Sequence, residues 1–459
     1  MKFSLLTCCS SDVIYLLTNQ PVFVFFGSVL FAIALGLLFP IAVLFIESSA
    51  ALFPDRDMSW LKSVDRPRIA VLVPAHNEAS GIKETIKTIL PELTARDRLV
   101  VIAHNCTDNT AEIAKHCCEE YIQKRCCNSE VPMLPNSGKT QESAPSEPPF
   151  GILILERNDP EPTRWGKGYA LDYGLRAIEG DPPDVVVMID ADCIVEEGTI
   201  KRIASVAASS SRPVQATYLM KPPAEPKLTQ KVSALAFMVK NLVRPKGLAR
   251  LGLPCLLTGS GMAFPWSAIA SAPLATGNIV EDMQLGIDLA IAGYPPLFCQ
   301  DAEVSAFFSK KPKEDGGSWR RWVLGHLITL RTQSPRLIKA AVQQKRFDLL
   351  ALALELCVPP LSLLVMIWVV VMGGTLVAGT LGTSWIPAIV LTIEGFLLFI
   401  SVITAWAKFG RSYLSLWTLL TVPFFILQKI PIFLGMLIRR LSDRTSARRD
   451  DKEESSSLS

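Results

Sequence analysis

The chain has 459 residues, of which 49% are hydrophobic and 19% are charged, and its formal net charge is +3. This length accommodates one large domain or two smaller ones, and the low charged fraction predicts that part of the chain lies in lipid. The small net charge, without a basic stripe interleaved with aromatic residues, argues against a nucleic-acid partner. The 11 cysteines, including the pairs Cys117/Cys118 and Cys126/Cys127, fit no standard zinc spacing. In a chain this long we interpret them as reduced thiols rather than as a disulfide framework or a metal site.

The first apolar segment covers residues 21–46 and contains no charged residue. It exceeds the roughly 20 residues that an α-helix needs to cross a bilayer. A cleavable signal peptide is the alternative, but the run is too long and begins too far from the N-terminus. We therefore expect a retained transmembrane anchor at 21–46, after an N-terminal tail at 1–20.

A second uncharged stretch is too long for one span and has a Gly/Thr-rich middle at residues 373–383. We expect two transmembrane helices here, at 349–372 and 385–406, joined by an exposed turn.

A fourth apolar stretch, at residues 414–437, is interrupted by Lys429 and Pro431. It fits either a further crossing or a re-entrant or interfacial helix. Basic residues precede it at Lys408 and Arg411, and several arginines follow it in the charged tail at 438–459. Positive residues flank spans on the cytoplasmic side, so the pattern favours the re-entrant reading and a cytoplasmic tail.

Strand-like and helix-like stretches alternate between residues 66 and 345, which predicts an α/β domain with a mostly parallel sheet. Short β-branched or apolar runs predict strands at 69–73, 99–102, 152–155 and 185–189, and apolar spacing predicts helices at 82–90, from 110 onward and at 168–178. Residues 128–149 are rich in Ser, Pro, Glu and Asn and are best interpreted as a flexible insertion.

The most informative short motif is Asp190-Ala191-Asp192, directly after the apolar run 185–189. Ligands of open α/β sheets bind beyond the carboxyl ends of the strands, and two carboxylates there can hold a divalent ion that bridges diphosphate oxygens. The alternative is that one Asp caps a helix and the other is solvated. The place of the motif after a buried strand favours the metal site.

Glu281 and Asp282 open a second helix-like stretch. Acidic residues at a helix N-terminus often only complement the helix dipole, which explains one carboxylate better than two. An Asp in this place can also act as a general base that takes a proton from an attacking hydroxyl. Further on, Arg321 and Trp322 begin an amphipathic stretch that is typical of a helix at a membrane interface. In a site at the membrane, Arg321 can also contact a diphosphate and Trp322 can stack on a sugar.

Taken in order, these motifs resemble family 2 glycosyltransferases, over about residues 66 to 330. The similarity is to the membrane-embedded branch that contains cellulose, hyaluronan and poly-N-acetylglucosamine synthases and ceramide glucosyltransferase. The motifs that carry it are Pro74-Ala75-His76-Asn77-Glu78, Asn105-Cys106-Thr107-Asp108, Trp165-Gly166-Lys167-Gly168, Asp190-Ala191-Asp192, Gly259-Ser260-Gly261-Met262, Glu281-Asp282 and Arg321-Trp322.

The resemblance implies a GT-A fold between transmembrane helices, a nucleotide-sugar donor (usually a UDP-sugar), Mg²⁺ or Mn²⁺, and inversion at the anomeric carbon. It implies that Asp282 is the base beside Glu281 and that Asp192 is the likelier direct metal ligand, with Asp190. It also implies substrate-binding roles for Pro74, Ala75, Glu78, Asp108, Lys167, Asp190, Gly259, Ser260, Gly261, Arg321 and Trp322.

Two departures from the family pattern matter. Many members place an acidic pair where this chain has Ala103-His104, so selectivity for uracil is in doubt, although His104 can still hydrogen-bond a base. The Q-x-x-R-W motif of the family reads Ser318-Trp319-Arg320-Arg321-Trp322 here, which weakens the case for a processive synthase. Addition of a single sugar to a saccharide or a lipid-linked acceptor becomes at least as well supported.

The expected protein is therefore a multi-pass membrane enzyme in polysaccharide or glycolipid synthesis, with its catalytic domain in the cytoplasm and possible partners in an assembly complex. Two alternatives stay open: a polyprenyl-phosphate sugar synthase, and a catalytically inactive scaffold that binds nucleotide sugar. The first usually lacks the Glu281-Asp282 and Arg321-Trp322 motifs that are present here, and intact Asp190, Asp192 and Asp282 argue against the second. A transporter is disfavoured because the spans show no paired repeat.

Overall fold

The computed structural model of the chain describes residues 21–54, 65–128, 151–161, 164–276, 280–308 and 312–427. The expected insertion beyond residue 128 and the two tails lie outside these residues. The described chain forms two compact units. One comprises the described parts of Met1–Phe39, Pro360–Leu397 and Arg411–Ser459, and the other those of Pro40–Pro359 and Leu398–Gly410.

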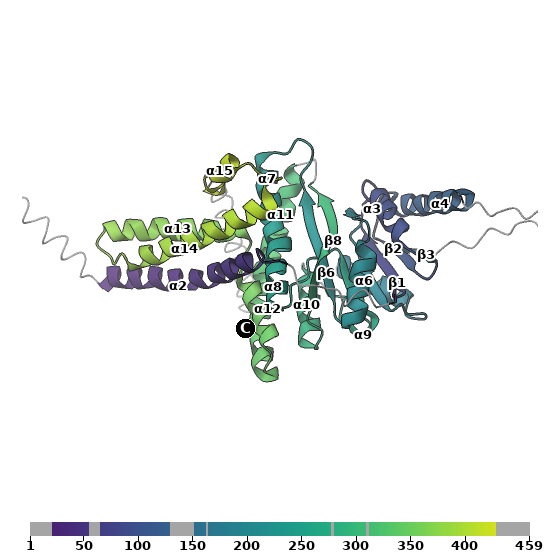
Figure 1. Cartoon of the computed structure of the whole chain (residues 1–459), viewed down its shortest axis with the longest axis horizontal. Helices are drawn as coiled ribbons and strands as arrows, with labels where there is room; N and C mark the ends of the chain where they lie inside the picture. Colours follow the sequence, from purple (N-terminus) through teal and green to yellow (C-terminus); the bar gives the residue numbers. More distant parts are fainter. Residues whose placement is uncertain are drawn as a thin grey trace, which may run out of the picture. The chain divides into compact units, whose positions relative to one another are not determined.

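The second unit is built on an eight-stranded sheet with the order β3-β2-β1-β4-β7-β6-β8-β5 (Figure 1). Strands β1 to β4 pair in parallel, whereas β7 runs antiparallel to both β4 and β6, β8 is parallel to β6, and β5 is antiparallel to β8. The sheet is thus mixed, and the expected parallel arrangement holds for its first half. The strands are β1 Ile69–Ala75, β2 Arg98–His104, β3 Gly151–Arg157, β4 Val185–Met188, β5 Cys193–Val195, β6 Val214–Lys221, β7 Met262–Pro265 and β8 Leu297–Phe307.

Helices cover both faces of this sheet, which explains why β1 and β4 are apolar at every position. Alternate residues of β1, such as Val71 and Leu72, are fully buried on opposite faces. The Val71 face packs against α3 Ile82–Ile89, α4 Thr110–Asn128 and α6 Thr199–Ser210. The Leu72 face packs against α5 Lys167–Ala177, α9 Trp266–Ile269 and α10 Glu281–Ile291. The result is a three-layer α/β/α domain.

The predicted elements of this domain are confirmed. The four predicted strands correspond to β1, β2, β3 and β4, and the three predicted helices to α3, α4 and α5. Boundaries differ by at most two residues, as at the end of β2, which continues through Ala103 to His104. A one-turn 3-10 helix, η2 Leu90–Glu92, extends α3.

The remaining helices of the second unit lie between β6 and β7 in the chain or follow β8. They include α7 Leu228–Met238, the π-helix η4 Val239–Val243, α8 Arg244–Leu251, α11 Pro312–Gln344 and α12 Phe347–Cys357. Leu337 of α11, together with Leu349 and Leu356 of α12, forms an apolar cluster with Met283 and Ile287 of α10.

Three helices are long and apolar enough to cross a membrane: Phe25–Ala50, Leu361–Thr380 and Ile386–Gly410. They belong to α2 Pro21–Ala50, α13 Leu361–Thr380, and α14 Ile386–Ala405 with the π-helix η5 Trp406–Gly410. Within the first unit the indole N–H of Trp368 on α13 donates to the carbonyl oxygen of Leu391 on α14, at 2.9 Å. These helices are consistent with membrane association.

The expected boundaries of the span at 349–372 are wrong. Helix α12 ends at Cys357 and α13 begins at Leu361, because Pro359 and Pro360 cannot continue a helix and the residue before a proline disfavours helical geometry. Leu349, Leu352 and Leu356 are buried against the α/β domain instead of facing lipid. The apolar segment 349–372 is therefore divided between two helices.

The expected turn at 373–383 is also placed differently. Helix α13 continues to Thr380 and so contains most of the residues at which the turn is expected. The turn is confined to the few residues before Ile386, so α14 matches the range expected at 385–406. In the fourth apolar stretch the structure describes α15 Leu416–Leu427, while Lys429 and Pro431 lie outside the described residues.

Candidate functional site

The loops after β1 and β2 interlock at the carboxyl edge of the sheet. The backbone N–H of Thr107 donates to the Asn77 side chain at 2.7 Å, and the N–H of Glu78 donates to the Thr110 hydroxyl at 2.9 Å. Asn77 and Asn105 adopt left-handed φ angles of 57° and 51°, which Asn tolerates better than most residues. Both turns therefore have the local geometry that their asparagines favour, and together they form one wall of the site.

Asp108 supports this wall. Its carboxylate accepts hydrogen bonds from the N–H of Ala79 at 3.1 Å and from both the N–H and the hydroxyl of Thr110, at 3.1 and 2.5 Å. These contacts tie the β1 loop to the N-terminus of α4. The Asp108 side chain thus has a structural role: it fixes the β1 loop against α4.

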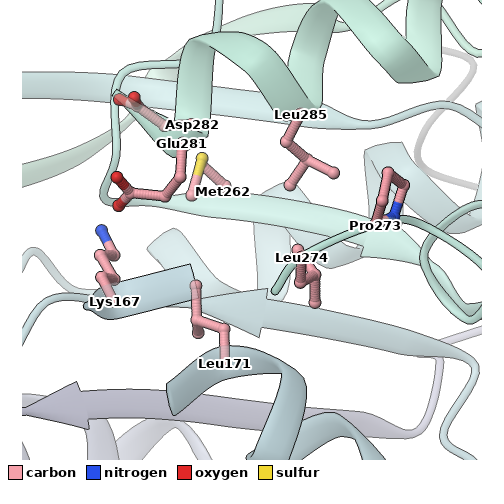
Figure 2. A pocket seen from close by; sticks show the side chains of 8 residues that line it. All are labelled: Lys167, Leu171, Met262, Pro273, Leu274, Glu281, Asp282 and Leu285. Atoms are coloured by element: carbon pink, nitrogen blue, oxygen red, sulfur yellow. The ribbon is translucent and has the colours of Figure 1, made fainter. Parts of the chain in front are cut away.

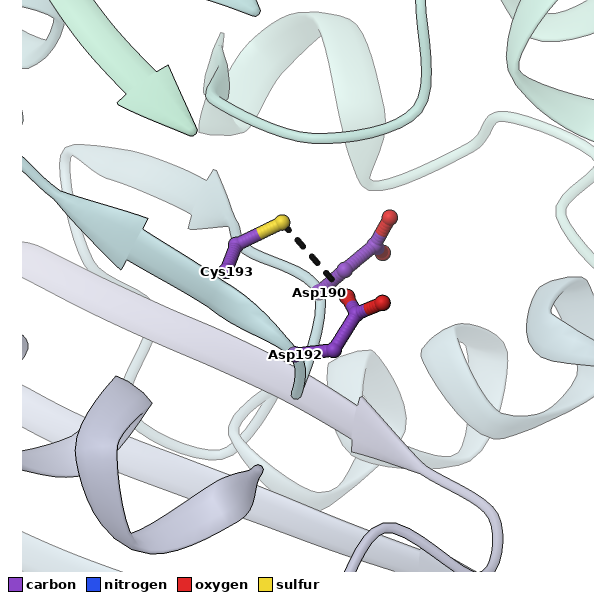
Figure 3. Close-up of side chains that lie close together, drawn as sticks. All are labelled: Asp190, Asp192 and Cys193. Carbon is purple, nitrogen blue, oxygen red and sulfur yellow. Dashed lines mark hydrogen bonds between the residues drawn. The ribbon is translucent and has the colours of Figure 1, made fainter. Parts of the chain in front are cut away.

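The Asp190-Ala191-Asp192 segment follows β4 at the same edge of the sheet, as expected. The N–H of Asp190 donates to the Ser260 hydroxyl at 3.0 Å, and the carbonyl oxygen of Ala191 accepts the hydroxyl hydrogen of Thr85 on α3 at 2.7 Å. Figure 3 shows the two carboxylates beside Cys193, whose thiol lies 3.6 Å from an oxygen of Asp192. The potential ligand atoms of Asp190, Asp192 and Cys193 lie within 4.8 Å of one another.

The two carboxylates fit a hard divalent cation better than the thiol does. Cys193 is fully buried, and burial together with the neighbouring Asp190 and Asp192 raises its thiol pKa well above its usual value. It therefore stays protonated, whereas Mg²⁺ and Mn²⁺ prefer carboxylate oxygens. Asp190 already forms an ion pair with Lys167, while Asp192 is exposed. Asp192, which has no ion pair within the described residues and accepts only the weak Cys193 thiol contact, is the carboxylate better placed to bind an ion.

Glu78 joins these carboxylates from the β1 loop. Burial, followed by the negative charges of Asp192, Asp190 and Asp108, raises its pKa to about 7. A half-buried acid whose pKa is raised by burial and by three nearby carboxylates is typical of a functional site.

Lys167 is the first residue of α5 and connects two parts of the site. Its ammonium donates to the carbonyl oxygen of Gly259 at 2.6 Å and pairs with Asp190. Figure 2 shows the same group pointing toward the carboxylate of Glu281. Burial opposes the charge, but Asp190 and Glu281 hold the pKa of Lys167 above its usual value. The pocket that they share is lined by Lys167, Leu171, Met262, Pro273, Leu274, Glu281, Asp282 and Leu285 (Figure 2).

Glu281 and Asp282 form the first turn of α10, as predicted from their place before an apolar run. One oxygen of Asp282 accepts the N–H of Met283 at 2.8 Å. Burial raises the pKa of Asp282, and this rise is opposed by Lys167, by the Met283 N–H and by Lys240. Burial and the adjacent Asp282 raise the pKa of Glu281 to about 7.

The segment from Gly259 to Met262 closes the site. Gly259 has a φ of +99°, and a Cβ there would lie 3.2 Å from the free oxygen of Asp282. Glycine therefore leaves room for a proton acceptor at this point. Ser260 is fully buried and holds the backbone of Asp190, so its role is to support the Asp pair rather than to face an acceptor.

Gln215 is a supporting residue that sequence reasoning missed. Its amide donates to the Ser260 carbonyl oxygen at 2.8 Å and its carbonyl accepts the Thr258 N–H at 2.8 Å. A single Gln at the start of a β-branched run carries no motif, so only the pairing of β6 with β7 exposes its role.

Other predicted residues lie at the edges. Pro74 and Ala75 are buried at the end of β1 and so sit below the loop that carries Glu78. His104 is buried, its Nδ1 has no partner within the described residues, and burial lowers its pKa, so it is neutral. Arg321 and Trp322 belong to α11, but their side chains lie outside the described part of the chain.

Comparison with known proteins agrees with this geometry. Residues 152–325 match the family described as glycosyltransferase like family 2. The chain is also 32% identical over 88 residues to the "Probable glycosyltransferase YdaM" of Bacillus subtilis (strain 168). That match covers 18% of this chain and 20% of the relative, so it spans only about a fifth of the length of that protein.

Among solved structures, the mannosyltransferase PcManGT from Pyrobaculum calidifontis, in complex with GDP-Man and Mn²⁺, is similar with a TM-score of 0.45 and 17% identity, over 83% of this chain and 99% of that one. Glucosyl-3-phosphoglycerate synthase from Mycobacterium tuberculosis, in complex with Mg²⁺ and uridine diphosphate, has a TM-score of 0.37 and 19% identity, over 61% of this chain and 84% of that one.

The family match covers the segment that contains Lys167, Asp190, Asp192, Gly259 and Asp282. This part of the chain is therefore similar to glycosyltransferases of family 2. The mixed sheet with helices on both faces is a GT-A fold, as the sequence motifs imply.

Proposed function

We propose that the family 2 domain of this protein is an inverting, metal-dependent transferase. It moves a sugar from a nucleotide-sugar donor to a hydroxyl of a saccharide or lipid-linked acceptor at the membrane, in polysaccharide or glycolipid synthesis. The observation that supports it most is that Lys167 and Asp282 line one pocket and that Lys167 also pairs with Asp190. Phosphate-directed and proton-accepting groups come from α5, α10 and the end of β4, which are far apart in the sequence.

The proposed step is an in-line displacement. An oxygen of Asp282 takes the proton of the acceptor hydroxyl while that hydroxyl oxygen forms a bond to the anomeric carbon. The bond from the anomeric carbon to the phosphate oxygen breaks, and its electron pair leaves with the nucleoside diphosphate. The acceptor attacks from the face opposite the leaving group, so the configuration inverts. The free oxygen of Asp282 beside Gly259 is the proton acceptor in this scheme.

The diphosphate gains charge as it leaves, and cationic groups stabilise it. Lys167 supplies one such group from the start of α5. Asp192, with Asp190, would hold Mg²⁺ or Mn²⁺, and a divalent ion supplies charge neutralisation of the diphosphate when bound. Donor and acceptor held in line by the pocket would provide much of the remaining acceleration.

The proposed binding roles follow from the edge on which each residue lies. Pro74, Ala75, Glu78 and Asp108 border the nucleoside side, because they end β1 or connect it to α4. Gly259 and Gly261 border the acceptor side. His104 lies where many family 2 members have an acidic residue that binds uracil. A UDP-sugar is therefore the first donor to test, and other nucleotide sugars are tested beside it.

The acceptor side includes Arg321 and Trp322 in this proposal, on a helix that enters the domain at a membrane interface. The three apolar helices support a multi-pass protein. We place the catalytic domain and the C-terminal tail in the cytoplasm, where nucleotide sugars are made, and membrane lipid and a polysaccharide assembly complex are the proposed partners.

The test is transfer by the full-length protein in purified membranes, with a panel of radiolabelled nucleotide sugars and Mg²⁺ or Mn²⁺, followed by sizing of the products. Asp282→Asn should keep donor binding and lose turnover by about 10³-fold or more, because a general base acts in the chemical step. Asp288→Asn, on the same helix but paired with Arg336, is the matched control and should transfer normally.

Normal turnover in the Asp282 variant would remove this residue from the base role. Donor binding without transfer of any sugar in the wild type would favour an inactive scaffold. Transfer only to a polyprenyl phosphate would favour a polyprenyl-phosphate sugar synthase.

A further inference from the structure

Two long apolar helices end beside each other in the second unit. Helix α2 ends at Ala50, and the helix that begins as α14 ends at Gly410 in η5. The ammonium of Lys408 in η5 donates to the carbonyl oxygens of Ala51 and Leu52, at 3.2 and 2.8 Å. Both helices are long and apolar enough to cross a membrane, so in a membrane their joined ends mark the level of one bilayer surface.

Helix α8 is fixed against the same end of α2 (Figure 1). Arg244, the first residue of α8, pairs with Glu47 of α2 at 2.5 Å, and both side chains are buried. A Cβ at Gly247 would meet the carbonyl oxygen of Glu47, so the backbones of the two helices are in contact. Glu47 lies less than one helical turn before Ala50, and α8 therefore lies at the level where α2 ends.

Three basic side chains gather around one aromatic ring at this level. The ammonium of Lys246 lies 5.8 Å from the centroid of the Phe409 ring, and the ammonium of Lys408 lies 5.3 Å from it. Arg250 is four residues after Lys246, so both lie on one face of α8. Lys408 is exposed, and Lys246 and Arg250 are partly exposed. Lys246, Arg250, Lys408 and Phe409 are called the basic surface below.

No acidic residue of the local sequence balances these charges. Residues 228–251, which form α7, η4 and α8, contain no Asp or Glu, and neither do residues 395–410. Glu47 contacts α8 from α2, but its charge is matched by the buried Arg244. The basic surface therefore attracts anions.

Exposed apolar residues border the basic surface. Leu52 and Phe53 follow α2 directly, and the carbonyl oxygen of Leu52 accepts a hydrogen bond from Lys408. Leu251, next to Arg250, is 47% exposed. Apolar groups beside cations are typical of protein surfaces at the headgroup level of a bilayer, where the apolar groups enter the acyl boundary and the cations meet phosphates. A soluble anion would contact only the charges.

We propose that the basic surface binds the headgroup phosphates of anionic phospholipids, at the bilayer surface beside the ends of α2 and η5. The inference rests on the part of the proposed function that places the protein in a membrane, and it does not depend on the transfer reaction. Because α8 is joined to α2 through Gly247 and Arg244, lipid bound at Lys246 and Arg250 holds the second unit against the bilayer. Positive residues that flank spans on the cytoplasmic side agree with this placement.

The expected magnitude follows from the charge of an anionic membrane surface. Each Lys or Arg near such a surface strengthens binding by about fivefold. Loss of the charges of Lys246 and Arg250 should therefore weaken the binding of anionic lipid by about 25-fold at low salt. The difference should shrink at high salt, because salt screens interactions between exposed charges.

The first experiment titrates the detergent-solubilised full-length protein with phosphatidylglycerol or phosphatidylcholine and measures bound lipid by native mass spectrometry. The wild type should prefer phosphatidylglycerol, and Lys246→Gln/Arg250→Gln should lose this preference while its binding of phosphatidylcholine stays unchanged. Lys115→Gln/Lys124→Gln is the matched control, because it removes two exposed charges from α4 at the β3 edge of the sheet. Equal affinity of the wild type for both lipids, or an unchanged preference in the α8 variant, would overturn the proposal. Displacement of phosphatidylglycerol by an excess of inorganic phosphate would also overturn it and would assign the surface to a soluble anion.

A second measurement leaves the basic residues in place. In a background without native cysteines, a fluorophore is attached to Leu251→Cys, and the full-length protein is placed in nanodiscs of phosphatidylcholine and phosphatidylglycerol. A spin label on the lipid headgroup should quench this fluorophore and should leave one attached to Lys124→Cys on α4 bright. Equal quenching at both positions, or none at Leu251→Cys, would show that α8 does not lie at the bilayer surface. Neither measurement uses a nucleotide sugar, so failure of the transfer assay leaves this proposal standing, and failure here leaves the proposed reaction standing.

Discussion

Replacing Glu47 by leucine should destabilise the second unit strongly, because it leaves the buried guanidinium of Arg244 without its counter-ion. Glu47 and Arg244 are 2% and 6% exposed, and their side chains meet at 2.5 Å. Breaking a buried pair by removing one partner costs about 3–5 kcal/mol. Arg244 keeps its bond to the carbonyl oxygen of Glu355, so the cost should lie near the lower end of that range.

A loss of about 3 kcal/mol corresponds to a fall in melting temperature of about 6–12 °C, at about 2–4 °C per kcal/mol for a domain of this size class. The assay is thermal unfolding of the detergent-solubilised full-length protein, followed by size-exclusion chromatography after heating. Glu84→Gln is the control. It breaks the exposed pair of Glu84 with Lys87 and should leave the melting temperature unchanged.

The double variant Glu47→Leu/Arg244→Leu tests the reasoning further. Both charges are then gone, so most of the lost stability should return, apart from the contribution of the bond to Glu355. A melting temperature of Glu47→Leu equal to the wild type would refute the argument. So would a double variant as unstable as the sum of the two single variants, because the two side chains would then be independent.

Three further outcomes are expected. Asp192→Ala should abolish Mn²⁺-dependent donor binding in calorimetry, since Asp192 is the carboxylate better placed to bind an ion after β4, and unchanged affinity with and without Mn²⁺ would contradict this. The pKa of Glu78 is about 7 in the folded protein and 4.5 in the unfolded chain. The contribution of Glu78 to the free energy of unfolding is therefore largest below about pH 4.5, and this contribution is lost as the pH rises through about 7. The melting temperature of the metal-free protein should therefore fall between about pH 5 and pH 8, and Glu78→Gln should reduce that fall; an unaltered slope would count against the shifted pKa. In a background without native cysteines, Ser455→Cys should resist a membrane-impermeant thiol reagent applied to intact cells, because the arginines around residue 440 favour a cytoplasmic tail, and labelling from outside would support a fourth crossing instead.

The α/β domain could be read from the sequence because each of its central elements is locally consistent. The run Val185-Val186-Val187-Met188 predicts a strand that is buried on both faces, and all four residues are buried in β4. The apolar spacing of α3 places Ile82, Ile86 and Ile89 on one buried stripe. Strand order was not readable in the same way, because β7 enters between β4 and β6 from about 70 residues later in the chain.

The apolar helices show where composition misleads. A window of hydrophobic residues does not distinguish a lipid-facing helix from one that is buried in protein, so composition alone predicts a single span at 349–372. The two prolines before Leu361 and the burial of Leu352 against α10 divide it into α12 and α13. The packing of α12 against the domain decided that boundary, and such packing leaves no periodic pattern in the sequence.

The sequence by itself determined the chemical types and the order of the site: Asp190 and Asp192 after a buried strand, Lys167 at the start of a helix, and Glu281 with Asp282 at the start of another. Those positions are set by local rules, since strand ends and helix starts are marked within a few residues. Only the tertiary structure decided which of these groups meet and which are already bound. Lys167 reaches across 92 residues to Gly259, and Ser260 supports Asp190 across 70. Such contacts form because the sheet brings distant loops together at one edge. The spacing of residues along the chain does not predict which loops meet there.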